Sequence, residues 1–278
     1  MASQVLNRAR ASFTEPTMLK PLKRSITTPA HSAPLAISGS VPIRYSIVRN
    51  LDTPSVRPIQ LRFGKDGEGS TLTFPHTRAS SEPLQQLLTA ASPTTMLRSG
   101  QEVLDTDYRE VGKLNANQFA TNFCPHAGGV LDTVAPQLLP FAGCDKEKRG
   151  VVAEIVRWNA YSAPGGKFKL HSDAAQNEKH FGRLVVALPT EFEGEHALPC
   201  KLNVLLLMLT LSSGGELILR SKGQELVCDW SKAATPAGYA PSALPTIPWV
   251  AFHNGCQHEV REVTAGHRFT LTYSLYAT

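Results

Sequence analysis

Residues 151–173 read VVAEIVRWNAYSAPGGKFKLHSD, and this stretch decides the fold. The run from Val151 to Tyr161 is rich in β-branched and aromatic residues, which favour β-strands. Residues 162–166 contain one proline and two glycines, which interrupt a strand. Residues 167–170 then lead into His171 as a second extended segment. The stretch therefore predicts two consecutive strands joined by a tight turn.

Further strand-like segments follow along the rest of the chain. They occupy residues 183–189, 215–219, 225–230, 249–252, 258–263 and 268–275. Glycine and proline separate them, and no long helical period lies between them. Short strands separated in this way are typical of a β-sandwich or a β-barrel. We therefore expect a mainly β fold.

The second predicted strand ends in the tripeptide His171-Ser172-Asp173. On an extended segment, residues i and i+2 point to the same face, so His171 and Asp173 can reach one metal ion. The pattern alone is weak, because a chain with nine histidines contains it by chance and a solvated loop is the default interpretation. A third ligand has to come from a different strand.

Three histidines near the C-terminus are candidates for the third ligand. His253 precedes an Asn-Gly turn dipeptide, and His267 follows a glycine before the final predicted strand. His258 alone is followed after ten residues by an arginine, Arg268. Two imidazoles and one carboxylate are the ligand set of non-haem iron(II) oxygenases, and a buried arginine suits a dicarboxylate co-substrate. This pattern favours His258 and predicts a 2-oxoglutarate- and iron-dependent dioxygenase.

Five segments of the chain resemble the prolyl 4-hydroxylase-type 2-oxoglutarate/Fe(II) dioxygenases, in particular fungal and bacterial members. The segments are residues 159–173, Phe181–Pro189, Gly214–Leu217, Cys256–Val260 and Gly266–Tyr273. The resemblance spans roughly residues 100–276. It implies a double-stranded β-helix, which is a jelly-roll or cupin-like barrel, with a few buttressing helices and a metal in its mouth.

The resemblance also implies roles for individual residues. Arg268 would pair with the distal carboxylate of 2-oxoglutarate through its planar guanidinium. Thr270 and Tyr161 would donate hydroxyl groups to the same co-substrate. Relatives often carry a tyrosine three residues before the first histidine, and Phe168 cannot supply that hydroxyl. The implied iron(II) ligands are His171, Asp173 and His258.

Two classes of function remain open from the sequence. In the first, the protein uses O₂, iron(II) and 2-oxoglutarate, with ascorbate as a candidate reductant, to hydroxylate an unactivated C–H bond and release succinate and CO₂. A protein substrate of the prolyl type leads over a small molecule by family analogy. Nucleic-acid demethylases carry a second arginine six residues after the first, where this chain has Ser274. The alternative is a catalytically impaired or non-catalytic jelly-roll module for binding or interaction.

The chain of 278 residues, 42% of them hydrophobic, is long enough for one catalytic domain with extensions. We expect a flexible, basic N-terminal extension over residues 1–50, where seven basic residues accompany only one acid. We expect a mixed approach region over residues 51–150, with strands near 55–63 and 70–74 and helices starting near Glu82 and Gly128. The predicted catalytic core is residues 151–278.

Composition limits the compartment and the partners. The acid-poor N-terminus suits either a disordered tail or a mitochondrial presequence. No apolar segment resembles a secretory signal or a membrane span, and basic residues do not cluster with aromatic ones as in nucleic-acid binding. The cysteines are five and form no C-x-x-C pair, which argues for a reducing interior. We expect an intracellular protein of the cytoplasm or nucleus.

One segment, about residues 196–213, departs from the family pattern. Relatives run almost directly from a Phe-Glu-Gly stretch into Gly-Glu-Leu, whereas here an apolar segment intervenes. Its uniformly apolar part, residues 202–211, is too short to span a membrane. Two interpretations remain: an insertion specific to this lineage that packs against the barrel, or translated intron sequence.

Overall fold

A computed structural model describes residues 34–42, 45–46, 55–56, 58–64, 69–76, 81–98, 101–139, 150–190, 215–230 and 246–278. They all belong to the compact unit Pro34–Thr278. The insertion expected at about 196–213 and most of the extension expected over residues 1–50 lie outside the described residues.

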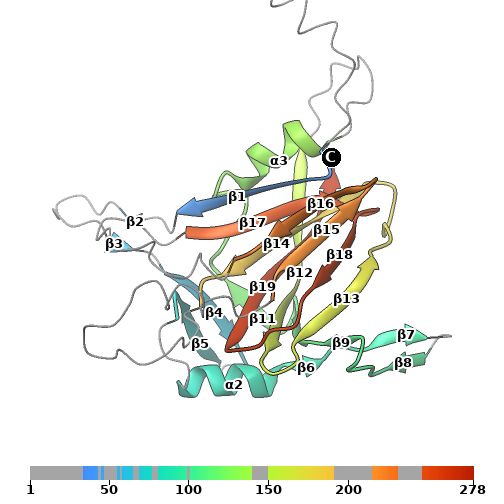
Figure 1. The fold of residues 1–278 in the computed structure, drawn as a ribbon. Coiled ribbons are helices and arrows are strands. Elements are labelled where there is room, and N and C mark those ends of the chain that lie inside the picture. Colours follow the sequence, from blue (N-terminus) through green and yellow to red (C-terminus); the bar gives the residue numbers. More distant parts are fainter. Residues whose placement is uncertain are drawn as a thin grey trace, which may run out of the picture. The chain divides into compact units, whose positions relative to one another are not determined.

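The larger sheet consists of antiparallel strands in the order β1-β17-β14-β19-β12-β10-β6 (Figure 1). In that order the strands are Ala36–Pro42, Thr246–His253, His180–Leu188, His267–Ala277, Val151–Ser162, Gly112–Asn115 and Ser92–Pro93. The strands expected near 151–161, 183–189, 249–252 and 268–275 are therefore confirmed. Neighbouring strands in this sheet are mostly not consecutive in the sequence, so crossover connections link them.

The second sheet has the order β16-β15-β18-β13-β9. Its strands are Gln224–Cys228, Leu217–Ser221, Gln257–Val260, Lys167–Ser172 and Arg109–Glu110. Residues of both sheets form one buried cluster that includes Tyr161, Phe168 and Phe252. Two antiparallel sheets with facing inner surfaces make the mainly β, jelly-roll-like fold expected from the sequence.

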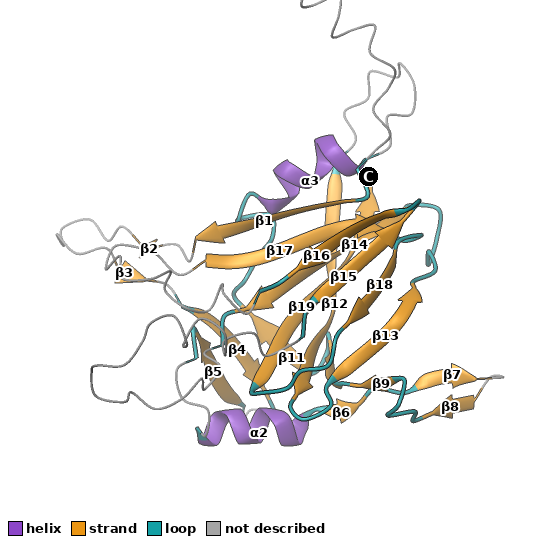
Figure 2. Ribbon diagram, in the orientation of Figure 1, coloured by secondary structure: helices purple, strands orange, loops and turns teal. Residues whose placement is uncertain are grey.

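The remaining strands form smaller sheets (Figure 2). One contains β11 (Phe119–Thr121), β4 (Ile59–Phe63) and β5 (Ser70–Phe74); the two-stranded pairs are β2 (Tyr45–Ser46) with β3 (Ser55–Val56) and β7 (Met96–Arg98) with β8 (Gln101–Val103). The strands expected near 55–63 and 70–74 thus form, with an interruption between β3 and β4.

Two helices are present in the described part of the chain. Helix α2 (Glu82–Ala90) begins after Ser81, whose side-chain oxygen accepts a hydrogen bond from the backbone N–H of Leu84. Helix α3 (Val130–Leu138) begins after Gly129, whose left-handed backbone suits glycine. Helix α3 contacts β1, β12 and β17, and α2 contacts β5. They are the buttressing helices expected from the sequence.

The two faces of the larger sheet differ in chemistry because alternate residues point to opposite sides. On β19, Phe269 and Leu271 belong to the large hydrophobic core, which also contains residues of β4, β5, α2 and α3. The intervening residues Arg268, Thr270 and Thr272 are buried and polar. A buried polar face between two sheets needs a specific explanation, because burying polar groups without partners is costly.

Segments outside the predicted core extend both sheets. Strand β1 lies within the range expected as a flexible extension, yet it pairs with β17 over its whole length. From the expected approach region, β10 pairs with β12 and β9 pairs with β13. The two main sheets therefore include strands that precede residue 151, namely β1, β6, β9 and β10.

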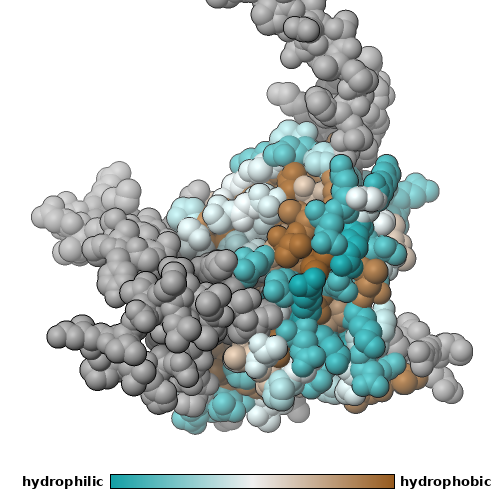
Figure 3. All heavy atoms as spheres, in the orientation of Figure 1, coloured by the Kyte–Doolittle hydropathy of each residue, from teal (hydrophilic) through white to brown (hydrophobic). Residues whose placement is uncertain are grey.

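The surface view shows hydrophilic residues around a strip of hydrophobic ones on one face (Figure 3). Large hydrophobic residues that are exposed in the described part of the chain are Leu104, Val152, Leu170 and Val227. No helix among the described residues is long and apolar enough to span a bilayer.

Candidate metal centre

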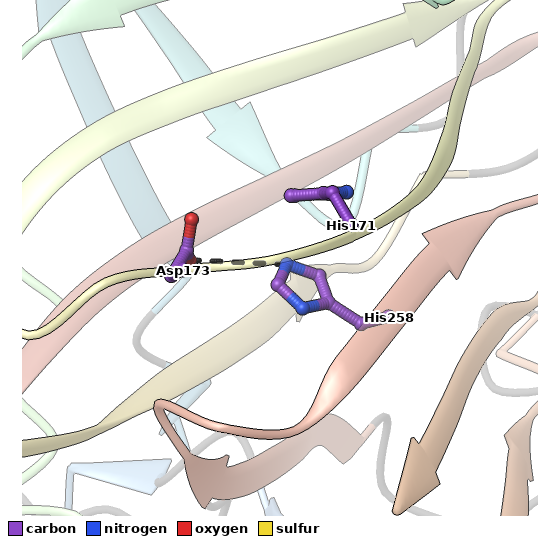
Figure 4. A group of neighbouring side chains, drawn as sticks. All are labelled: His171, Asp173 and His258. Atoms are coloured by element: carbon purple, nitrogen blue, oxygen red, sulfur yellow. Dashed lines mark ion pairs between the residues drawn. The ribbon is translucent and has the colours of Figure 1, made fainter.

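His171, Asp173 and His258 come together as the sequence predicted. His171 lies on β13, Asp173 follows the end of that strand, and His258 lies opposite His171 on the neighbouring strand β18. One potential ligand atom from each residue lies within 4.8 Å of the other two. The side chains of Asp173 and His258 approach each other, with Nε2 of His258 3.8 Å from Oδ2 of Asp173 (Figure 4).

The turn between β12 and β13 sets the position of His171. Gly165 has a φ of 102°, a conformation that other residues rarely adopt. The N–H of Gly166 donates to the carbonyl of Ser162 at 2.9 Å, and a Cβ on Gly166 would collide with the backbone of Ser162. The Pro-Gly-Gly segment thus provides a turn tight enough to start β13 four residues before His171.

Backbone carbonyls orient both imidazoles in the same way. Nδ1 of His171 lies 2.8 Å from the carbonyl oxygen of Lys169, and Nδ1 of His258 lies 3.3 Å from that of Cys256. A carbonyl only accepts hydrogen bonds, so each Nδ1 carries the proton and each Nε2 offers a lone pair. Nε2 of His171 is buried without a hydrogen-bond partner among the described residues. An orphaned acceptor in this position fits a metal ligand.

The charges of the three groups also fit a cation. Burial lowers the pKa of His171 and of His258, so both imidazoles are neutral at neutral pH. Burial alone would raise the pKa of Asp173, but nearby positive charge, first that of Arg183, brings it below its ordinary value. Nε of Arg183 lies 2.9 Å from Oδ2 of Asp173 in an ion pair. Two neutral nitrogens and one carboxylate are the protonation states that metal binding needs.

A cavity adjoins the centre between the two sheets. It is partly open to solvent. Asp173 and His258 line it together with Tyr161 and Thr270, two of the residues predicted to hold the co-substrate. The cavity therefore places those two hydroxyl-bearing side chains in the same space as two candidate metal ligands.

A hydrogen-bonded row of polar residues forms one wall of this cavity. Nδ2 of Asn159 on β12 donates to Oγ1 of Thr270 at 3.3 Å and to Oγ1 of Thr272 at 3.0 Å. Because both hydroxyls accept from the amide, each keeps its own hydrogen to donate elsewhere. The wall thus offers two hydroxyl donors to a ligand in the cavity.

Arg268 lies at the same inner face but is not among the residues that line the cavity. It pairs across the sheet with Tyr161, and its guanidinium carbon lies 5.9 Å from the Tyr161 ring centroid and 4.9 Å from that of Trp230. Burial lowers its pKa, while Tyr161, Cys228, Glu216 and Asp229 act in the opposite direction. Its Nε and Nη1 atoms have no hydrogen-bond partner within the described part of the chain.

Several polar residues of the cavity were not singled out in the sequence. Asn159 and Arg157 precede Tyr161 at two-residue intervals on β12, and Thr272 follows Thr270 on β19. Their alternation with residues already identified could have revealed them. Arg183 lies on β14, and no sequence interval links it to Asp173.

The other two candidate histidines lie elsewhere. His253 ends β17 before the Asn-Gly turn, as its sequence suggested, and its ring contacts Phe181. His267 begins β19, where Nδ1 lies 2.9 Å from Oγ of Ser162 and the ring stacks on Phe269. Neither belongs to the group of potential metal ligands found among the described residues.

Comparisons with known proteins give matches among solved structures alone. No family model matches the chain. A search of curated proteins gave no match. Among solved structures, the chain is similar to an oxidoreductase of the 2OG-Fe(II) oxygenase family from Burkholderia pseudomallei, at 16% identity, 69% coverage of this chain, 76% coverage of that chain and a TM-score of 0.34.

Two prolyl hydroxylase structures are similar at the same level. One is a prolyl-4-hydroxylase from Pseudomonas putida, at 16% identity, with 69% of this chain and 81% of that chain covered and a TM-score of 0.36. The other is a prolyl hydroxylase from Trichoplax adhaerens in complex with a hypoxia inducible factor peptide fragment, at 13% identity, 69% and 76% coverage and a TM-score of 0.40. These values are too low to carry an argument, so the interpretation of the site rests on its own residues.

Proposed function

We propose that the protein is a dioxygenase that depends on iron(II) and 2-oxoglutarate. The observation that carries this proposal is the group formed by His171, Asp173 and His258, with the buried and unpartnered Nε2 of His171. Two imidazoles and one carboxylate on one side of a metal leave its other positions open for small ligands. When bound, iron and 2-oxoglutarate would supply the hydroxylation of a C–H bond by O₂, in which one oxygen atom enters the product and the other enters succinate as CO₂ is released.

In this proposal the chain's own residues hold and orient the two cofactors. The three ligands fix the metal, while the carbonyls of Lys169 and Cys256 keep both imidazoles in the ligating tautomer. The ion pair with Arg183 keeps Asp173 ionised and occupies one side of its carboxylate.

The proposed co-substrate site is the polar wall of the cavity. Tyr161 and Thr270 would donate their hydroxyl groups to 2-oxoglutarate, and Arg268 would pair with its distal carboxylate. Phe168, Leu217 and Phe252 add an apolar lining that limits water around the reacting groups. The sequence resemblance alone supports a prolyl-type protein or peptide substrate, and it supports ascorbate as a reductant only by analogy.

The test is an anaerobic titration of the purified protein with Fe(II) and 2-oxoglutarate, followed by visible absorption. The expected result is the weak charge-transfer band of the chelate, saturating at one equivalent of iron. His258→Ala should abolish the band, whereas the matched variant His253→Ala should keep it. A folded wild-type protein with no band would instead favour the alternative, a non-catalytic binding module.

A further inference from the structure

Three arginines from both sheets lie within electrostatic reach of Asp173. Arg109 lies on β9 of the second sheet, Arg157 on β12 and Arg183 on β14 of the larger sheet. Arg109 and Arg183 are only 9% and 8% exposed. Side chains of this type are almost never buried unless they are paired.

Nε of Arg183 lacks a hydrogen bond but is ion-paired with Asp173, whereas the other two guanidiniums have buried nitrogens with neither kind of partner among the described residues. Nε and Nη2 of Arg109, and Nε of Arg157, are buried without a hydrogen-bond partner among the described residues. The Arg109 guanidinium lies 3.9 Å above the ring of Phe168, which lines the cavity. Arg157 lines the cavity directly. Arg157 therefore presents an unsatisfied donor at the cavity wall, and Arg109 has two such donors beside the lining residue Phe168.

Arg183 differs from these two arginines because it is partly neutralised. Besides its ion pair with Asp173, its Nη1 donates to Oγ of Ser274 at 3.3 Å. On the outer surface the fold pairs an arginine fully: Arg220 contacts Glu225 and Glu259 at 2.7 and 2.8 Å. Unpartnered donors thus occur on arginines buried between the two sheets, Arg268 included, whereas Arg220 has acidic partners.

The charge balance around the cavity is positive. Within the described part of the chain, Asp173 is the one carboxylate whose charge raises the pKa of Arg109 or Arg157. Burial lowers the pKa of Arg109 to about 10, so the group stays protonated at neutral pH. Three arginines against one carboxylate leave two positive charges (3 − 1 = 2), and a divalent metal would add to this excess. Buried charge without compensation is strongly destabilising.

We infer that Arg109 and Arg157 form a second anion-binding site beside the metal centre, which takes a carboxylate or phosphate group. The planar guanidinium forms paired hydrogen bonds with such oxyanions, and the stacked ring of Phe168 holds that of Arg109 in place. Only the source of the anion rests on the proposed function. It is either an anionic group of the oxidised substrate or the distal carboxylate of 2-oxoglutarate itself.

The first experiment uses the metal-free, full-length protein and needs no activity. Inorganic phosphate and succinate are titrated by calorimetry at constant ionic strength, and melting temperature is followed in parallel. Wild type should bind at least one of these anions and gain melting temperature. Arg157→Met and Arg109→Met should each weaken that binding at least about tenfold, as expected for loss of one charged partner. Arg62→Met, at an exposed position on β4, is the control and should bind as wild type does.

A structural role for these arginines predicts a different result. If they only support the fold, Arg157→Met should lower the melting temperature in buffer without added anion. An uncompensated charge predicts an unchanged or higher value in the same buffer. Arg157→Lys keeps the charge without the paired donors, and it should retain anion binding at reduced affinity if the methionine variant does not fold.

The second experiment identifies the source of the anion in the Fe(II)-loaded protein. A tenfold or larger loss of 2-oxoglutarate affinity in Arg157→Met assigns the site to the co-substrate. Unchanged 2-oxoglutarate affinity, with anion binding lost, assigns it to the primary substrate. Absence of anion binding in wild type, or full anion binding in both methionine variants, overturns the inference. Anion binding without any iron chelate would overturn only the proposed function.

Discussion

Two arginine-bearing regions lie between the two main sheets, one at Arg268 and one at Arg109 and Arg157. These two ends differ in how nearby acids compensate the arginine charge. At one end, burial lowers the pKa of Arg268, while Tyr161, Cys228 and the carboxylates of Glu216 and Asp229 act in the opposite direction. At the other end, Arg109 and Arg157 share the single carboxylate of Asp173, which also belongs to the candidate metal centre. Donors without a hydrogen-bond partner occur at both ends among the described residues, but two carboxylates act on Arg268, whereas Arg109 and Arg157 share one.

This difference shows that spacing in the sequence and charge balance in the structure identify different residues. The interval from His258 to Arg268 pointed to one arginine for the co-substrate, and that assignment remains a proposal. The cavity lining points to Arg157 instead, because Arg157 borders the empty space and Arg268 does not. The predictions below treat the two ends separately.

The largest effect is expected from removing the acid at each end. Asp173→Asn removes one of three ligands and should abolish stoichiometric Fe(II) binding, since two imidazoles hold the metal too weakly. Glu216→Gln removes an acid at the Arg268 end and should leave Fe(II) affinity as in wild type. Anaerobic equilibrium dialysis measures both. Equal iron binding by the two variants would place the metal elsewhere.

A smaller loss is expected when the support of Asp173 is removed. Arg183→Met deletes the ion pair and should raise the pKa of Asp173, because the positive charge that favours its ionised form is gone. Iron affinity should fall about 10–100-fold, as is typical for residues that orient a ligand. The loss should grow as the pH decreases. Metal titrations at several pH values check this, and a loss independent of pH would contradict the electrostatic role of Arg183.

The arginine at each end can be compared through 2-oxoglutarate itself. Arg268→Lys replaces a bidentate guanidinium with a single ammonium charge. It should lower the affinity for 2-oxoglutarate at least about tenfold and leave the affinity for iron unchanged. The measurement is the 2-oxoglutarate concentration that half-saturates the chelate band. Unchanged affinity in Arg268→Lys, in a protein with wild-type circular dichroism, would remove Arg268 from the site.

The smallest effect concerns pH and the metal-free protein. Burial lowers the pKa of His171 from its ordinary 6.5 to about 4, so between these values the unfolded chain binds more protons than the folded one. Stability should therefore fall as the pH decreases from about 6.5 towards 4. His171→Asn should make stability less dependent on pH in this range. Each kcal/mol of unfolding free energy that no longer changes with pH corresponds to about 2–4 °C in melting temperature. Identical pH profiles for wild type and variant would show that His171 does not stay neutral in the fold.

Much of the fold was predictable because alternation along a strand records which face is buried. Trp158 and Ala160 belong to the large hydrophobic core, whereas Asn159 and Tyr161 line the cavity. The sequence of β12 shows this alternation directly. The pairing of β1 with β17 was not predictable, because no local pattern in residues 36–42 specifies a partner two hundred residues away.

The candidate site shows the same limit. His171 and Asp173 were predictable from a two-residue interval, and the distant His258 from its context. Arg183 and Arg109 reach Asp173 and Phe168 only through the pairing of strands far apart in sequence. Their burial and missing partners are properties of the folded chain, so no sequence interval could have revealed them.

The most direct test of the metal centre is a crystal structure of the protein grown without oxygen in Mn(II) and 2-oxoglutarate. The expected result is one anomalous peak bound by Nε2 of His171, Nε2 of His258 and a carboxylate oxygen of Asp173. The same map would show whether the distal carboxylate meets Arg268 or Arg157. A metal bound by other residues, or no metal between these three side chains, would contradict the account.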